Sequence, residues 1–226
     1  MKDETLKIDN IFNNISKNIF IKETKKGFLL KDRTSKMTFS LNLDEYENII
    51  FQSNKHVLSK IFKKKQLMIL DCTGGFARDS AIISSLGNNV TMIEENPVVM
   101  CLLRDAICRI QNNKIDQIFK RITTKLGGCL DYIKATNKLY DYIYFDFMFN
   151  ASKTALPSKR EQFLRGIVQN DININKAIVE EVLQRVSCKV IIKEHIKSND
   201  YRHLDIINTY KEKVVKYHLL QGKNGY

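Results

Sequence analysis

The sequence predicts an α/β fold: a doubly wound, mostly parallel sheet covered by helices on both faces, with a small β-containing appendage at the N-terminus. Short apolar runs alternate with helical segments from residue 67 onward, and repeated β-α-β units build a parallel sheet. The chain has 226 residues, enough for one large domain with a small addition. Hydrophobic residues make up 43% of it, which suffices for a packed core.

Residues 1–66 differ in pattern from the rest of the chain and predict the appendage. Phe28–Leu30 and Met37–Leu41 flank a polar turn at Asp32–Ser35, which is typical of a small β-hairpin. A helical stretch over about Asp44–Phe62 follows. The segment holds 14 lysines and arginines against 8 aspartates and glutamates. We therefore expect two units, residues 1–66 and residues 67–226, with half of the excess positive charge on the first.

In the second unit, strands and helices are expected to alternate along the chain. The buried-strand candidates are Leu67–Leu70, Val90–Ile93, Ile122–Lys125, Tyr140–Phe145, Lys189–Lys193 and Val214–Leu220. The helical candidates are Arg78–Leu86, Pro97–Gln111, Leu130–Lys134, Arg160–Val168, Asn173–Val186 and Tyr201–Tyr210. Proline suits a first helical turn, and aromatic and β-branched residues suit a strand. In a sheet of this kind, ligands bind at the carboxyl ends of the strands.

A glycine-containing loop follows the first of these strands and opens a helix. It reads Asp71-Cys-Thr-Gly-Gly-Phe-Ala-Arg-Asp79, and Gly74 and Gly75 allow a tight turn and the close approach of a ligand. A tight structural turn would explain the loop equally well by itself. The next strand ends at Glu94, 20 residues after Gly74. An acid at about this distance accepts hydrogen bonds from ribose hydroxyls, although acids also favour a helix entrance.

The residue types around this loop favour S-adenosylmethionine over a dinucleotide. The loop lacks the G-K-[ST] of a nucleotide P-loop and the G-x-G-x-x-G of a dinucleotide site. S-adenosylmethionine has no phosphates and carries a positive sulfonium and an amino group. We expect Asp71 or Asp79 to face the amine of its methionine part.

A second candidate site follows the strand at 140–145, which runs directly into Asp146-Phe-Met-Phe149. Amino-methyltransferases need a hydrogen-bond acceptor and a flat ring beside the cofactor. We expect Asp146, or a neighbouring carbonyl, to accept hydrogen bonds from an exocyclic amine, and Phe149 to stack on an unpaired or flipped-out base, a contact worth roughly 1–3 kcal/mol. Phe147 and Met148 would line the substrate side. The alternative is that the aromatic residues belong to the core and Asp146 is a cap.

Together these motifs resemble the RsmJ-type enzymes, a family of small-subunit ribosomal RNA (guanine-N2) methyltransferases that depend on S-adenosylmethionine. The resemblance covers roughly residues 65–195 and is carried by Asp71–Asp79, Ile93–Asp105 and Asp146–Phe149. Its most specific part is E-x-N-P-V-V followed by L-L-x-D. It implies a class I methyltransferase domain, Rossmann-like, with a seven-stranded sheet.

By position, the resemblance implies cofactor contacts at Arg78, Asp79, Glu94, Glu95, Gly128, Cys129 and Asp146. The chain departs from the family pattern at several positions. Ala77 stands for a glycine, Glu95 for an arginine, Gly128 and Cys129 for two serines, and Phe147 and Asn150 for prolines.

The net charge of +12 indicates a polyanionic partner, although scattered surface lysines in a Lys-, Ile- and Asn-rich chain would give the same value. With the resemblance, RNA is the expected partner. Basic residues after the candidate catalytic loop would meet its phosphates, or would form a solvated face: Lys153, Lys159, Arg160 and Arg165. Lys193, at the end of a late strand, would face the site or extend to the surface.

Composition also excludes several classes of protein. No apolar run approaches the roughly 20 residues of a membrane span, and the N-terminus lacks the apolar core of a secretory signal, so we expect a cytoplasmic protein. The five cysteines lack C-x-x-C spacing, which predicts reduced, mostly buried thiols and no metal site. Two other functions stay open: an amino-methyltransferase for DNA adenine or protein, and a non-catalytic RNA-binding protein with a degenerate methyltransferase fold.

Overall fold

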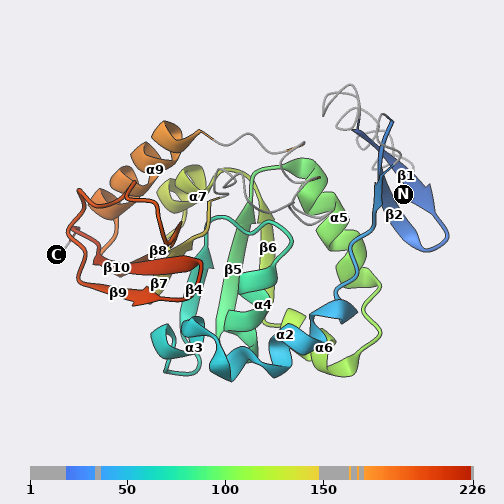
Figure 1. Ribbon diagram of the computed structural model, residues 1–226, viewed down its shortest axis with the longest axis horizontal. Helices are drawn as coiled ribbons and strands as arrows, with labels where there is room; N and C mark the ends of the chain where they lie inside the picture. The colour runs from blue at the N-terminus through green and yellow to red at the C-terminus, as the bar shows by residue number, and fades with distance from the viewer. Residues whose placement is uncertain (1–18, 34–36, 148–162, 164–166, 168–170, 225–226) are drawn as a thin grey trace.

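The structure is a computed structural model that describes residues 19–33, 37–147, 163, 167 and 171–224 (Figure 1). Among these residues, seven strands form one sheet in the order β6-β5-β4-β7-β8-β10-β9. The neighbours from β6 to β8 pair in parallel, whereas β10 runs antiparallel to both β8 and β9. The predicted doubly wound, mostly parallel, seven-stranded sheet is therefore confirmed.

The strands of the sheet coincide closely with the apolar runs of the sequence. Their bounds are β4 Met68–Asp71, β5 Asn89–Glu94, β6 Ile122–Leu126, β7 Tyr142–Phe145, β8 Lys189–His195, β9 Asn208–Lys211 and β10 Val215–Gln221. The central strands are nearly continuous runs of buried residues, because both faces of the sheet are covered. All six predicted strands are present.

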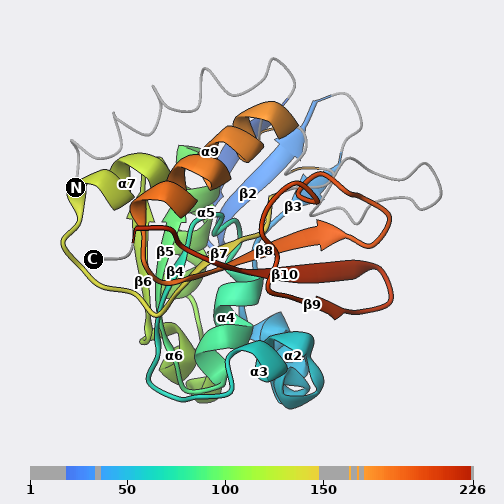
Figure 2. The same cartoon turned by 90° about the vertical axis from the view of Figure 1, so that its left-hand side faces the viewer.

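Helices cover the sheet on two sides, and alternate residues of each strand enter two separate cores. On one side lie α4 (Arg78–Ser85), α5 (Pro97–Cys108) and α6 (Asn113–Phe119), and on the other α7 (Cys129–Ala135) and α9 (Ile172–Arg185). Figure 2 shows α7 and α9 together, away from α4 and α6. In β4, Ile69 belongs to the first core and Leu70 to the second, as the two-residue period of a strand requires.

Side-chain caps fix where several helices begin. The Asn96 side chain accepts hydrogen bonds from the backbone N–H groups of Val98 and Val99, and Pro97 occupies the first turn of α5. Asn112 caps α6 in the same way. The sequence analysis did not predict α6, although this cap preceded an apolar pattern.

The N-terminal segment forms a three-stranded antiparallel sheet beside α5, made of β1 (Ile19–Thr24), β2 (Gly27–Asp32) and β3 (Thr38–Phe39) (Figure 1). The predicted hairpin corresponds to β2 and β3, whereas β1 was not predicted. The Phe28 N–H donates to the Asp105 carboxylate of α5 at 3.1 Å. The boundary at residue 66 stays a prediction.

The single helical stretch predicted for residues 44–62 is wrong in detail, because the chain forms four short helices there. These are η1 (Asp44–Tyr46), α2 (Glu47–Phe51), η2 (Ser53–Lys55) and α3 (Val57–Ile61). The backbone of His56 is extended, and its Nδ1 atom accepts the N–H of Leu58 to cap α3. This local bond interrupts a continuous helix.

The helix predicted for Tyr201–Tyr210 is also wrong: residues 201–203 form a turn and β9 begins at Asn208. Tyr210 pairs with Tyr217 of β10, so backbone pairing at the sheet edge decides the conformation of this polar segment. The helix predicted for 160–168 lies mostly outside the described residues. Phe163 and Ile167, which are described, are helical and buried.

No helix in the described part of the chain combines the length and apolarity that a membrane crossing needs. All five cysteines are free thiols. Cys72 and Cys129 are buried, Cys101 and Cys188 are partly buried, and Cys108 is exposed. Among the described residues, no group of three or more histidine, cysteine, aspartate or glutamate side chains is arranged to hold a metal ion.

Candidate functional site

The glycine-containing loop lies at the carboxyl end of β4 and is held by its own buried acid. The Asp71 carboxylate accepts the Ser80 hydroxyl at 2.5 Å and the Thr73 N–H at 3.0 Å. Gly74 N–H donates to the Ile93 carbonyl of β5, and a Cβ at Gly74 would lie 2.3 Å from Met92 Cγ. Burial raises the pKa of Asp71 to about 6. The loop is therefore fixed tightly against β5.

Glu94, the last residue of β5, joins the loop to the next helix. One carboxylate oxygen accepts the Gly75 N–H at 2.7 Å, and the other accepts the Asn96 N–H at 2.7 Å. Gly75 has a φ of 53°, a left-handed conformation that favours glycine. Burial raises the pKa of Glu94. A carboxylate has about four acceptor positions, and the Glu95 backbone also contributes a hydrogen bond, so part of this capacity is left for a ligand.

Asp146 follows β7, and the same loop contacts it. Its N–H donates to the Thr73 hydroxyl oxygen at 2.6 Å, and the Asp71 carboxylate in turn accepts the Thr73 N–H. Residues 71–77 thus bond to Glu94 through Gly75 and to Asp146 through Thr73. The glycine loop, Glu94 and Asp146 therefore meet at one edge of the sheet.

Lys193 of β8 lies in this site between two carboxylates. Its ammonium group donates to Asp79 Oδ2 and to Asp146 Oδ2, each at 2.8 Å. The Tyr144 hydroxyl also donates to Asp79 Oδ2, at 2.6 Å. Only 16% of the Lys193 side chain is exposed. Of the two positions that the sequence left open for Lys193, facing the site or extending to the surface, the structure has the first. No sequence spacing connects residues 79, 146 and 193.

Charges in this cluster act unequally on its three ionisable groups. Burial raises the pKa of Asp146 to about 7, against the effect of the Lys193 charge, while Asp79 adds to the rise. Burial also opposes ionisation of Asp79, but Lys193 and the Tyr144 hydroxyl outweigh it and lower the Asp79 pKa. Burial opposes the charge on Lys193, yet the two carboxylates hold its pKa well above the usual range.

A cavity of about 220 Å³ opens beside Glu94, between the ends of β5 and β6. It is lined by Ile93, Lys125, Leu126, Gly127, Gly128, Asp131 and Tyr132. The Gly127 N–H donates to the Glu94 carbonyl at 3.0 Å, so the cavity adjoins the backbone of Glu94. Its walls combine apolar and aromatic side chains, which suit a flat base, with the charged residues Lys125 and Asp131, and the neighbouring Glu94 carboxylate suits ribose hydroxyls.

The remaining predicted site residues fall into three groups. Arg78 and Glu95 have exposed side chains beside the loop and beside Glu94. Gly128 caps α7 at the cavity, and Cys129 is buried next to it; the ring of Phe147 stacks on Phe145, with centroids 5.3 Å apart. The last group lies outside the described residues: Met148, Phe149, Lys153, Lys159, Arg160 and Arg165.

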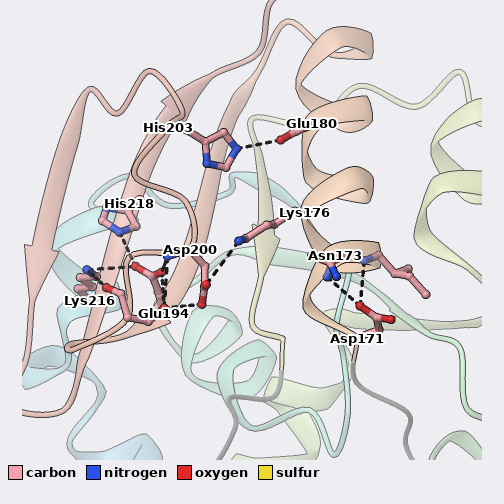
Figure 3. A network of polar contacts seen from close by, with 11 residues as sticks. Asp171, Asn173, Lys176, Glu180, Glu194, Asp200, His203, Lys216 and His218 are labelled. Carbon is pink, nitrogen blue, oxygen red and sulfur yellow. Dashed lines mark hydrogen bonds and ion pairs between the residues drawn. The ribbon is translucent and has the colours of Figure 1, made fainter.

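Glu194, the neighbour of Lys193, belongs to a second polar cluster that the sequence analysis did not predict (Figure 3). Its carboxylate accepts the Asp200 N–H at 2.6 Å, binds His218 at 3.0 Å and pairs with Lys216 at 3.1 Å. Asp200 also pairs with Lys176 of α9. Because its groups satisfy one another, this cluster fixes the loop after β8 to β10 and α9, and we assign it a structural role.

The donor set at the first site fits S-adenosylmethionine. Glu94 offers a carboxylate beside the cavity at the ends of β5 and β6, and Asp71, Asp79 and Asp146 supply acidic groups that suit a positive ligand. Among the described residues, Lys193 is the one ammonium bonded into this cluster, and it faces two carboxylates, those of Asp79 and Asp146.

Comparisons with known proteins agree with this fit. A family model described as "Putative SAM-dependent methyltransferase" matches residues 21–219. A ribosomal RNA small subunit methyltransferase J of Buchnera aphidicola subsp. Schizaphis graminum is 29% identical over 202 residues, with 81% of each protein covered. That of Pseudomonas syringae pv. syringae is 31% identical over 133 residues, 58% of this chain and 49% of that protein. The chain spans about half the length of the first curated relatives it matches.

Among solved structures, the crystal structure of an S-adenosylmethionine-dependent methyltransferase from Neisseria gonorrhoeae is similar, with a TM-score of 0.73. It is 19% identical, and the match covers 92% of this chain and 85% of that one. At this identity the likeness confirms the fold.

Proposed function

This chain belongs to the family of S-adenosylmethionine-dependent methyltransferases, and from that premise we propose that it methylates the exocyclic amine of a guanine in small-subunit ribosomal RNA. The relatives named as ribosomal RNA small subunit methyltransferases support this substrate. The positive net charge supports a polyanionic partner. We also propose that the protein works in the cytoplasm, where ribosomal RNA is modified.

A single observation carries the proposal: one loop bonds to the acids that end two different strands. Gly75 donates to Glu94, and Thr73 accepts from Asp146. A nucleoside bound at Glu94 would therefore lie close to the Asp146 carboxylate, because the same loop contacts both residues. A cofactor site and a substrate site need this proximity, since most of the rate of group transfer comes from alignment.

Each group in the proposed site has a defined part. When bound, S-adenosylmethionine supplies an electrophilic methyl group on a positive sulfur. Glu94 binds the ribose, and Asp71 and Asp79 attract the positive methionine part. Asp146 accepts an N–H of the target amine, which aims the nitrogen lone pair at the methyl carbon. When the methyl group is transferred, Asp146 would take up the proton that the amine nitrogen loses and pass it to water.

Substrate binding would be completed by Phe147, whose ring stacks on Phe145, and by residues outside the described part. Phe149 would stack on the base, and Met148 and Phe147 would line the same side. The basic residues Lys153, Lys159, Arg160 and Arg165 would meet phosphates. Loss of any one of these four lysines and arginines is expected to weaken RNA binding and to reduce its salt dependence.

Transfer of a labelled methyl group tests the proposal. The protein is incubated with labelled S-adenosylmethionine and, separately, with ribosomal subunits, naked ribosomal RNA, DNA and a protein extract. Label in a guanine of small-subunit RNA is the expected result. Label only in DNA adenine or in protein would replace the substrate, and the absence of label together with the absence of cofactor binding would favour a non-catalytic RNA-binding protein.

A further inference from the structure

Resting on the proposed function, we infer that Lys193 is a positioning residue that opposes protonation of the Asp146 carboxylate and orients it, so that it accepts the target amine through Oδ1. No motif in the sequence assigns this role. Lys193 lies in β8, which pairs with β7, the strand that ends just before Asp146. Its side chain reaches the Asp146 carboxylate from the side of α4, where it also contacts Asp79. It acts on the substrate only through Asp146.

The two carboxylate oxygens of Asp146 differ in their contacts. Oδ2 accepts the Lys193 ammonium at 2.8 Å. The backbone N–H of Asp146 is fixed separately by the Thr73 hydroxyl. Within the described residues, no hydrogen bond occupies Oδ1, and 28% of the Asp146 side chain is exposed. The free oxygen of a carboxylate held at its other oxygen and at its backbone has a restricted direction, which an in-line methyl transfer needs.

Lys193 is itself anchored at a second point. Asp79 Oδ2 accepts both the Lys193 ammonium and the Tyr144 hydroxyl. Tyr144 is fully buried in β7, so Asp79 has a rigid partner on one side. The ammonium is thus held between two carboxylates, and its bond to Asp79 restricts where it can lie relative to Asp146.

The position of Lys193 beside Asp146 matters because of its positive charge. An aspartic acid buried beside other acids tends to bind a proton, and a protonated Asp146 is a poorer acceptor for an amine. Among the described residues, the groups that face Asp146 are Lys193 of β8, Asp79 of α4 and Asp71 of β4, with Tyr144 and Tyr217 near the same cluster. Of these, Lys193 is the positive one and opposes protonation, whereas Asp79 and Asp71 favour it.

Two substitutions are expected to move the pH dependence of methyl transfer in opposite directions. Lys193→Met removes the ammonium, so the pH at which single-turnover transfer reaches half its maximum rises by at least about one unit. At pH 7 the rate falls at least about fivefold and recovers near pH 9. Asp79→Asn removes a negative neighbour and lowers the same midpoint. Lys193→Arg retains a cation and restores most of the wild-type profile.

The matched control is Lys189→Met, which removes an exposed lysine from the same strand. Its profile should match that of the wild type. A rate for Lys193→Met that is reduced equally at every pH, with an unmoved midpoint, would assign Lys193 a purely structural role and overturn the inference. If that variant does not fold, an unshifted midpoint in Asp79→Asn overturns it instead.

A measurement without substrate separates this inference from the proposed function. In the full-length protein labelled with ¹³C at aspartate carboxyl carbons, the Asp146 resonance, assigned with Asp146→Asn, should titrate at higher pH in Lys193→Met. If the protein transfers no methyl group to RNA but shows this shift, the proposed substrate is refuted and the inferred Lys193–Asp146 coupling stands. A chain that methylates RNA but shows no shift retains the substrate and refutes the coupling.

Discussion

Replacing Glu94 with alanine tests the cofactor site at the residue that joins its two halves. The substitution removes two hydrogen bonds, from the N–H groups of Gly75 and Asn96, each 2.7 Å long. Hydrogen bonds to a charged group contribute about 1.5–3 kcal/mol each. Both donors are partly accessible, so water replaces part of the loss. We expect the free energy of unfolding to fall by about 2–4 kcal/mol.

The same substitution should weaken the affinity for S-adenosylmethionine at least about tenfold, which corresponds to roughly 1.4 kcal/mol. Two causes act together: the ribose contact is lost, and the glycine turn loses the bond from Gly75 to β5, while the bond from Gly74 to Ile93 remains. Titration calorimetry at neutral pH measures the affinity, and urea unfolding measures the stability. Glu94→Gln keeps one acceptor oxygen and should lie between the wild type and the alanine variant.

Glu95→Ala is the matched comparison, because Glu95 is the exposed neighbour of Glu94. The family resemblance implies a cofactor contact at both positions, and the geometry favours Glu94. We expect the Glu95 variant to bind the cofactor within about threefold of the wild type. A folded Glu94→Ala protein with wild-type affinity would refute the ribose assignment. A larger loss from Glu95→Ala than from Glu94→Ala would transfer the contact to the exposed side chain.

Three further predictions concern Asp146, Glu194 and Gly75. Asp146→Ala should abolish methyl transfer while circular dichroism shows a native fold; near-normal transfer would remove Asp146 from the reaction. Burial opposes ionisation of Glu194, but His218 and the other hydrogen-bond partners of Glu194 lower its pKa to about 2. The ionised Glu194 carboxylate therefore stabilises the fold above about pH 4.5, and this stabilisation is lost as the pH falls toward 2. Glu194→Gln should therefore lower the free energy of unfolding at pH 7 by up to about 3 kcal/mol and flatten its acid dependence in urea titrations, whereas an unchanged dependence would contradict the assignment. Gly75→Ala should destabilise the fold by about 1–2 kcal/mol through backbone strain, because φ is 53°. Among the described residues beyond its chain neighbours, only the Thr73 carbonyl oxygen lies within 4 Å of the added carbon, so crowding adds little, and a stabilised variant would contradict the strain argument.

The sequence predicts most of the central sheet because buried parallel strands are nearly continuous apolar runs. It fails at β9, a four-residue polar edge strand that becomes a strand by pairing with β10. It fails also between residues 44 and 62, where the cap at His56 divides the helix. Helix α6 was predictable, since Asn112 stands before Ile115, Ile118 and Phe119 at helical spacing.

At the site, sequence reasoning finds Glu94 and Asp146, which stand at the ends of strands, and misses the contacts that Lys193 makes from a neighbouring strand. The position of Glu94 after a strand and a glycine turn indicates its place, and so does that of Asp146 after β7. Their link through Thr73 and Gly75 depends on how the loop folds. The partners of Lys193 lie 114 and 47 residues away in the chain, and a pairing over such separations depends on the tertiary fold.

The most direct test of the account is a crystal structure of the protein with S-adenosylhomocysteine. The account predicts the ribose hydroxyls within hydrogen-bond distance of the Glu94 carboxylate, the base in the cavity lined by Ile93 and Tyr132, and the sulfur on the side of Asp146. A ligand bound at another edge of the sheet, or one whose sulfur points away from Asp146, would contradict it.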